Sequence, residues 1–208
     1  MADESAWSKS SAVPGGAYDI MAEVAQLFPL ATSSLPFLEA GLNDTTVVLL
    51  STGLIERFLR LSLISVFRSD TVSKNMIAKV FEGKGPLSTF SAKIDVCTGL
   101  GNLLPDARHD LLVINKIRNE FAHSPRQLFL KDFSGCLSLK LKSRLEIRDD
   151  CKQREMFKHS CAGIIGSLTS GTLISIATNR FVAANADGVI KEYELMIRSA
   201  ETDAEPSE

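Results

Sequence analysis

Residues 160–179, SCAGIIGSLTSGTLISIATN, run for twenty positions without a charged side chain. A helix of that length can cross a bilayer, so this stretch bears on whether the chain folds in water or in lipid. It holds four serines, four threonines or asparagines and three glycines, which makes it far less apolar than a typical membrane span. We therefore expect a buried helix of a water-soluble core, with a break at Gly171. Its apolar side would be formed by Ile164, Ile165, Leu168, Leu173, Ile174 and Ile176.

Apolar residues at helical spacing recur along most of the chain and predict further helices. The clearest covers residues 44–67, where Asn43 or Asp44 can cap the start. Its apolar stripe consists of Val47, Leu50, Leu54, Phe58 and Leu61. Other helices are predicted over 19–28, ended by Pro29, over 73–81, from Ser88 or Ser91 to Leu100, and over 105–124.

Length and composition indicate one all-α domain, a single helical bundle. The chain has 208 residues, of which 45% are hydrophobic and 23% charged, as in soluble globular proteins. We place the domain at residues 18–198, between a leader over 1–17 and an acidic tail over 199–208. Residues 11–198 carry 22 basic and 19 acidic side chains, a balance too weak for a dedicated duplex-binding protein.

The four cysteines show no CxxC spacing, and no histidine pair stands near them. Neither a metal site nor a disulfide framework is therefore predicted, and no cofactor is implied. The N-terminal residues are acidic and polar, unlike a secretory signal. A cytoplasmic location fits this pattern best.

The segment RNEFAH, Arg118 to His123, combines three polar groups that could do chemistry at the end of a predicted helix. Successive helical residues turn by about 100°, so Asn119 and His123 share a face, whereas Arg118 lies about 140° away from His123. One helix would not aim both Arg118 and His123 at one spot, but a second copy across a twofold axis could complete a site. The other interpretation is that His123 only caps the last turn.

Three separated blocks of sequence resemble the mannitol operon repressor (MltR-like) family. They are LLSTGLIERFLRLSL, FEGKGPLSTFSAKIDVCTGLGNL and IRNEFAHS, and together they span roughly residues 44–132. That family is regarded as part of the HEPN superfamily of all-α dimers. Many HEPN members carry an arginine, a polar residue and a histidine at the positions of Arg118, Asn119 and His123.

The resemblance implies a homodimer and leaves three functions open. Mannitol-repressor relatives are regulators without an obvious DNA-reading element, so we expect a transcriptional regulator that acts through protein or nucleic-acid contacts. Catalytic HEPN proteins are metal-independent endoribonucleases, in which Arg118 would hold a phosphate and His123 would transfer a proton. A non-catalytic protein-interaction module is the third interpretation.

Lys93 and Glu56 are weaker candidates for the same site. The resembling family has a basic residue at the position of Lys93, which could line a nucleic-acid site or be an ordinary surface lysine. Glu56 could orient Arg118, or it could form an exposed helical pair with Arg60. Residues 73–94 also imitate a helix-turn-helix, but the second helix offers few outward basic groups for reading DNA.

The region after RNEFAH holds a basic run and a possible strand. Lys140, Lys142 and Arg144 could form an RNA-facing strip, although such runs are more often solvated surface. Residues 136–143 alternate apolar and polar side chains, which permits one short strand paired with residues 128–133 in a hairpin.

Overall fold

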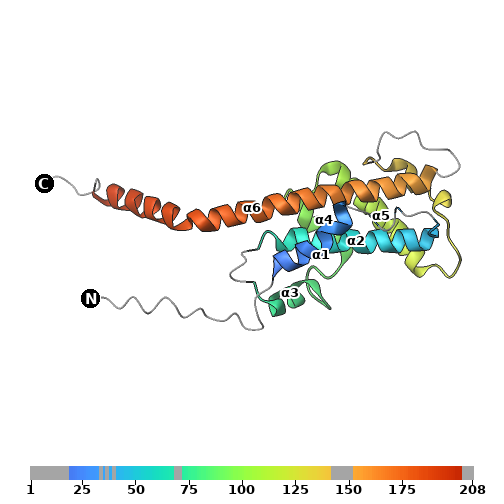
Figure 1. The fold of residues 1–208 in the computed structure, drawn as a ribbon, viewed down its shortest axis with the longest axis horizontal. Coiled ribbons are helices and arrows are strands. Elements are labelled where there is room, and N and C mark those ends of the chain that lie inside the picture. The colour runs from blue at the N-terminus through green and yellow to red at the C-terminus, as the bar shows by residue number, and fades with distance from the viewer. Residues whose placement is uncertain are drawn as a thin grey trace.

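The computed structural model describes the backbone of residues 19–32, 35, 38, 41–67, 72–141 and 152–202. It describes side chains within these ranges as far as Asn179, except those of residues 31 and 32. The described residues form six α-helices and two short 3-10 helices in one all-α domain, with no strand among them (Figure 1). The helices are α1 (Ile20–Thr32), α2 (Asp44–Ile64), α3 (Lys74–Phe81), α4 (Phe90–Gly99), α5 (Pro105–His123), η3 (Leu130–Asp132), η4 (Ser134–Ser138) and α6 (Lys152–Thr202). The predicted leader and most of the predicted acidic tail lie outside the described residues, so the domain limits stay predictions.

Helix α2 lies at the centre of the bundle and begins where the sequence predicts. The Asn43 side chain caps it by accepting a hydrogen bond from the Thr46 N–H at 2.7 Å. Four residues of the expected stripe are buried, but Leu50 is 40% exposed, so its assignment to the core was wrong. Ser51 and Thr52 take the buried places next to it, because their hydroxyls bond to the carbonyls of Val47 and Val48 and leave no polar atom unpaired.

Helix α5 packs antiparallel to α2. At one end, the Leu130 N–H, just after α5, donates to the carboxylate of Asp44 at the start of α2. At the other end, Asn102, just before α5, donates to Ser62 in the last turn of α2. The apolar residues Leu111, Ile114, Ile117 and Phe121 of α5 are buried. Both helices thus bury their long apolar stripes in the same bundle.

Helix α6 contains the uncharged stretch and continues through Gly171 without a break. Ile164, Ile165, Leu168 and Ile176 are buried against the bundle, as expected, whereas Leu173 and Ile174 are 39% and 67% exposed. The part from Lys152 to Asn179 is also long and apolar enough to cross a membrane, but a core helix of a soluble protein has the same properties. The buried positions show that one side of α6 packs on the other helices.

Two predicted element boundaries were wrong. Helix α1 continues through Pro29 to Thr32, because the burial of Val24 and Leu27 favours the helix over the hydrogen bond that proline removes. Helix α4 begins at Phe90, and neither Ser88 nor Ser91 caps it. The Thr89 hydroxyl does so by accepting a hydrogen bond from the Ala92 N–H at 3.2 Å.

The predicted hairpin after α5 was wrong over the described residues, since 3-10 helices occupy residues 130–132 and 134–138. Cys136 and Leu139, three positions apart, are buried, while Leu137 is 44% exposed. A spacing of three fits the 3-10 turn, whereas a strand needs a spacing of two. Residues 142 and 143 lie outside the described residues.

Candidate functional site at the end of helix α5

The RNEFAH motif forms the last two turns of α5. Ile117 and Phe121 hold this part of the helix in the core, so the polar residues of the motif lie toward the surface. Asn119 and His123 are exposed and Arg118 is half-buried. The Arg118 guanidinium donates to the Asn119 side-chain oxygen at 3.0 Å. Arginine and asparagine therefore form one unit, as neighbours along the helix.

His123 is separate from that unit. No hydrogen bond or ion pair joins it to Arg118 or Asn119 among the described side chains. The Ser124 N–H bonds to the Glu120 carbonyl at 3.0 Å and ends the helix there. Proton transfer to a substrate held by Arg118 requires both groups at one phosphate, and no contact among the described side chains joins them within one chain.

A groove begins two residues beyond His123. It is open to solvent and lies between the segment from Pro125 to Phe129, the N-terminus of α2 and Arg154 on α6. Asp44 holds its walls together: one oxygen accepts from the Leu130 N–H at 2.7 Å, and the other from the Arg154 guanidinium at 2.9 Å. Arg154 also donates to the Leu42 carbonyl. The sequence suggested Asp44 only as a helix cap, and it gives no signal for this wider role.

Asp110 is a second carboxylate whose role sequence reasoning missed. It is fully buried in α5 and accepts hydrogen bonds from the backbone N–H groups of Lys140 and Leu141, both at 2.8 Å. The Ser160 hydroxyl on α6 donates to it at 2.7 Å. A signal was present, because Asp110 falls within the apolar stripe of α5 beside Leu111. Its bonds are all internal, so its role is to join the chain after η4 to α5 and α6.

Lys93 is not the surface lysine that sequence reasoning favoured. Its side chain is 3% exposed, and the ammonium donates to Glu56 at 2.7 Å and to the Ser88 carbonyl at 3.1 Å. Both interpretations of Glu56 were wrong as well, since its partner is Lys93. Arg60 pairs instead with Glu23 at 2.8 Å. A buried ammonium with two partners is poorly placed to contact a nucleic acid.

The predicted basic strip is only partly described. Lys140 is half exposed, and its ammonium lies 3.1 Å from the Asp106 carboxylate. Lys142 and Arg144 lie outside the described residues. Only one residue of the strip is described, so the strip and its RNA-binding role stay predictions.

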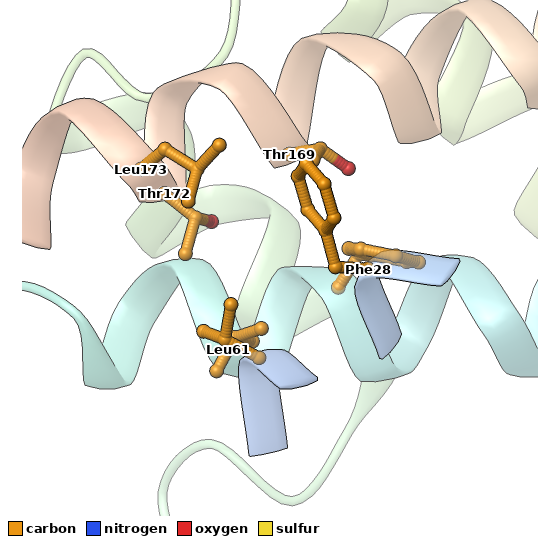
Figure 2. A pocket seen from close by; sticks show the side chains of 7 residues that line it. Phe28, Leu61, Thr169, Thr172 and Leu173 are labelled. Carbon is orange, nitrogen blue, oxygen red and sulfur yellow. The ribbon is translucent and has the colours of Figure 1, made fainter. Parts of the chain in front are cut away.

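A small apolar cavity lies between α1, α2 and α6 (Figure 2). Thr172 on α6 points toward Leu61 on α2, and Phe28 of α1 lies below Thr169 in this view. The Thr172 hydroxyl is buried without a hydrogen-bond partner. The cavity has room for about one water molecule, and a firmly held water needs at least two polar partners. It is therefore a packing gap and no binding site for a substrate.

Three cysteines are buried and unsuited to nucleophilic chemistry. Burial raises the pKa of the Cys97 and Cys136 thiols from 9.0 to about 12. Burial also raises the pKa of the Cys161 thiol, with Cys136 and Asp110 nearby adding to the effect. Since the thiolate is the reactive form, these neutral thiols act as small core residues. Cys151 lies outside the described residues.

No protein-family model, no curated protein and no solved structure matches this chain.

Proposed function

We propose that this chain is an MltR-like regulatory protein of the HEPN type, which works as a homodimer in the cytoplasm. Its role would be transcriptional regulation through protein or nucleic-acid contacts. The observation that carries the proposal is the exposed end of α5, where Arg118 is bonded to Asn119 and His123 stands apart. Such a surface can bind a partner, but within one chain it lacks the convergence that catalysis requires.

The region that imitates a helix-turn-helix gives no support for direct DNA reading. Thr89 serves as the cap of α4, and Lys93 is buried in an ion pair. Asp95, exposed on the same helix, pairs with Arg108 at 3.6 Å and would repel phosphate. A recognition helix needs several outward basic or amide groups, so contacts elsewhere are more plausible.

A metal-independent ribonuclease is the second candidate. Its support is that Asn119 and His123 are both exposed on α5, where a second chain could supply its Arg118. That interpretation requires the two α5 ends to meet near a twofold axis.

A non-catalytic interaction module is the third candidate. Val96, Leu100 and Leu104 are 39%, 48% and 64% exposed around the end of α4 and the start of α5. Exposed apolar residues that form one continuous patch often mark a protein contact.

The regulatory proposal is tested by transcript profiling of cells that naturally make this protein, with and without its gene. Cells lacking the chain should show a limited set of changed transcripts, and wild-type protein should restore them. The double variant Asn119→Ala/His123→Ala should fail to restore them, because it removes two exposed polar groups of the α5 end. Lys84→Ala is the matched control, since Lys84 is exposed on the turn between α3 and α4.

Restoration by the control but not by the double variant, at equal protein levels, would support the proposal. Unchanged transcripts in the deleted cells, or full restoration by the double variant, would contradict it.

A further inference from the structure

A cleft of about 430 Å³ opens to solvent between α1, α2 and α3, and no residue of α5 lines it. Six of the nine residues that line it are charged. Its volume falls in the range of small-molecule sites, roughly 300–1,000 Å³. Unlike the apolar cavity of Figure 2, this cleft is large enough and polar enough to hold a small, charged molecule.

The walls of the cleft are held together by Arg60 on α2. Its guanidinium donates to both carboxylate oxygens of Glu23 on α1, at 2.8 and 3.0 Å. It also lies 5.6 Å from the ring centre of Phe81 on α3, within the range of a cation–π interaction. The Phe81 ring in turn packs against Phe67, just after α2, with 6.4 Å between ring centres. These contacts fix the three helices around the cleft.

Two further basic side chains line the cleft, one from α2 and one from α3. Arg57 lies one turn before Arg60 on α2. Lys74 lies three residues before Ile77, which is buried and also lines the cleft, so Lys74 is on the side of α3 that faces the other helices. Neither Arg57 nor Lys74 forms an ion pair or a side-chain hydrogen bond with the residues that the structure describes.

Two of the three acidic residues in the cleft already have partners. Glu23 uses both oxygens to bind Arg60. One oxygen of Asp19 accepts hydrogen bonds from two backbone N–H groups in the first turn of α1. Glu82 is the third acid, and its carboxylate has no partner among the described side chains. The cleft therefore offers a ligand two free cations and one free anion.

This set of charges favours a ligand with two negative charges on one group. A phosphate monoester carries nearly two negative charges at about pH 7. The guanidinium of Arg57 can bind two phosphate oxygens at once, and the ammonium of Lys74 can act as a point charge. Glu82 would repel a second anionic group on the ligand, which disfavours dicarboxylates and bisphosphates. The cleft is larger than a phosphate ion and leaves room for an organic part.

We propose that the cleft between α1, α2 and α3 binds a small phosphate monoester. Arg57 and Lys74 hold the phosphate, and the organic part of the ligand fills the rest of the cleft. The ligand thereby bridges α2 and α3 and stabilises the folded chain. This inference does not rest on the proposed function, which concerns the end of α5.

Isothermal titration calorimetry of the full-length protein with glycerol 3-phosphate tests the site. The wild type should bind it, and Arg57→Gln and Lys74→Gln should each weaken binding about tenfold or more, because each removes a charge-assisted contact to the phosphate. Lys79→Gln is the matched control, since Lys79 is exposed on the same helix as Lys74 but does not line the cleft. It should bind as the wild type does. Circular dichroism melts should show that all three variants remain folded.

Three further compounds test which part of the ligand the cleft recognises. Inorganic phosphate should bind more weakly than the ester, because it leaves most of the cleft empty. Malate, whose two charges are on separate carboxylates, should bind about tenfold more weakly, and glycerol should not bind.

Four results would overturn the proposal. They are no binding of glycerol 3-phosphate at millimolar concentration, equal binding of malate, equal binding of inorganic phosphate, and unchanged affinity in Arg57→Gln and Lys74→Gln.

Discussion

Replacing Asp110 with alanine should lower the free energy of unfolding by about 3 kcal/mol, which is large for one side chain. The substitution leaves two backbone N–H groups and the Ser160 hydroxyl without their acceptor in a site closed to water. For a chain of this size, the melting temperature should fall by about 6–12 °C. Circular dichroism measures the free energy of unfolding by chemical denaturation and the melting temperature by thermal denaturation.

Asp106→Ala is the matched control for Asp110. Asp106 lies one turn earlier on α5 and pairs with Lys140 as well, but its side chain is 55% exposed. Exposed ion pairs contribute little, so the control should lose less than about 1 kcal/mol. Equal losses in the two variants would show that Asp110 does not hold the chain after η4 to the bundle.

Replacing Asp44 with alanine should cost about 2 kcal/mol and loosen the groove beside the α5 motif. The substitution leaves the Leu130 N–H unpaired and removes the carboxylate partner of Arg154, whose side chain is only 26% exposed. It also removes an acidic group from the first turn of α2, where the helix dipole favours one. Hydrogen exchange should become faster at Leu130, ahead of global unfolding.

Asp132→Ala controls for loss of an acidic residue in the same region, since Asp132 in η3 is exposed. We expect a change within about 0.5 kcal/mol for this control. Unchanged exchange at Leu130 in the Asp44 variant would mean that the loop is held by its apolar contacts alone.

The helices of this fold could be predicted because their signals are local. Asn43, Ser73 and Pro105 mark three helix starts with chemistry that depends on a few neighbouring residues. The stripe of α5 is buried as its spacing predicts. These features need no knowledge of what the helix packs against.

The errors arose where distant residues decide the structure. Pro29 is tolerated within α1 because of packing against other helices, and no local rule reports that packing. Lys93 is buried because Glu56 lies 37 positions away in sequence but within hydrogen-bond distance. The alternation over residues 136–143 was compatible with a strand, and the burial of Leu139 but not Leu137 excludes it there.

The sequence could predict which residues belong to the candidate site, but it could not predict how their side chains contact one another. The helical angle between Arg118 and His123 follows from their spacing. The structure shows no hydrogen bond between these two side chains, and Arg118 bonds to Asn119 instead. The groove beyond Pro125 depends on Asp44 and Arg154, which are 110 positions apart in sequence. Side chains so distant meet only once the bundle has formed.

The most direct test of the proposed regulatory role is an RNA cleavage assay. Pure wild-type protein would be incubated with end-labelled mixed RNA in the presence of a chelator, beside Arg118→Ala and His123→Ala. We predict that the RNA stays intact with all three proteins, because Arg118 bonds to Asn119 and lies about 140° around α5 from His123. Cleavage by the wild type that both substitutions abolish, with melting temperatures unchanged, would contradict the account and establish the ribonuclease instead.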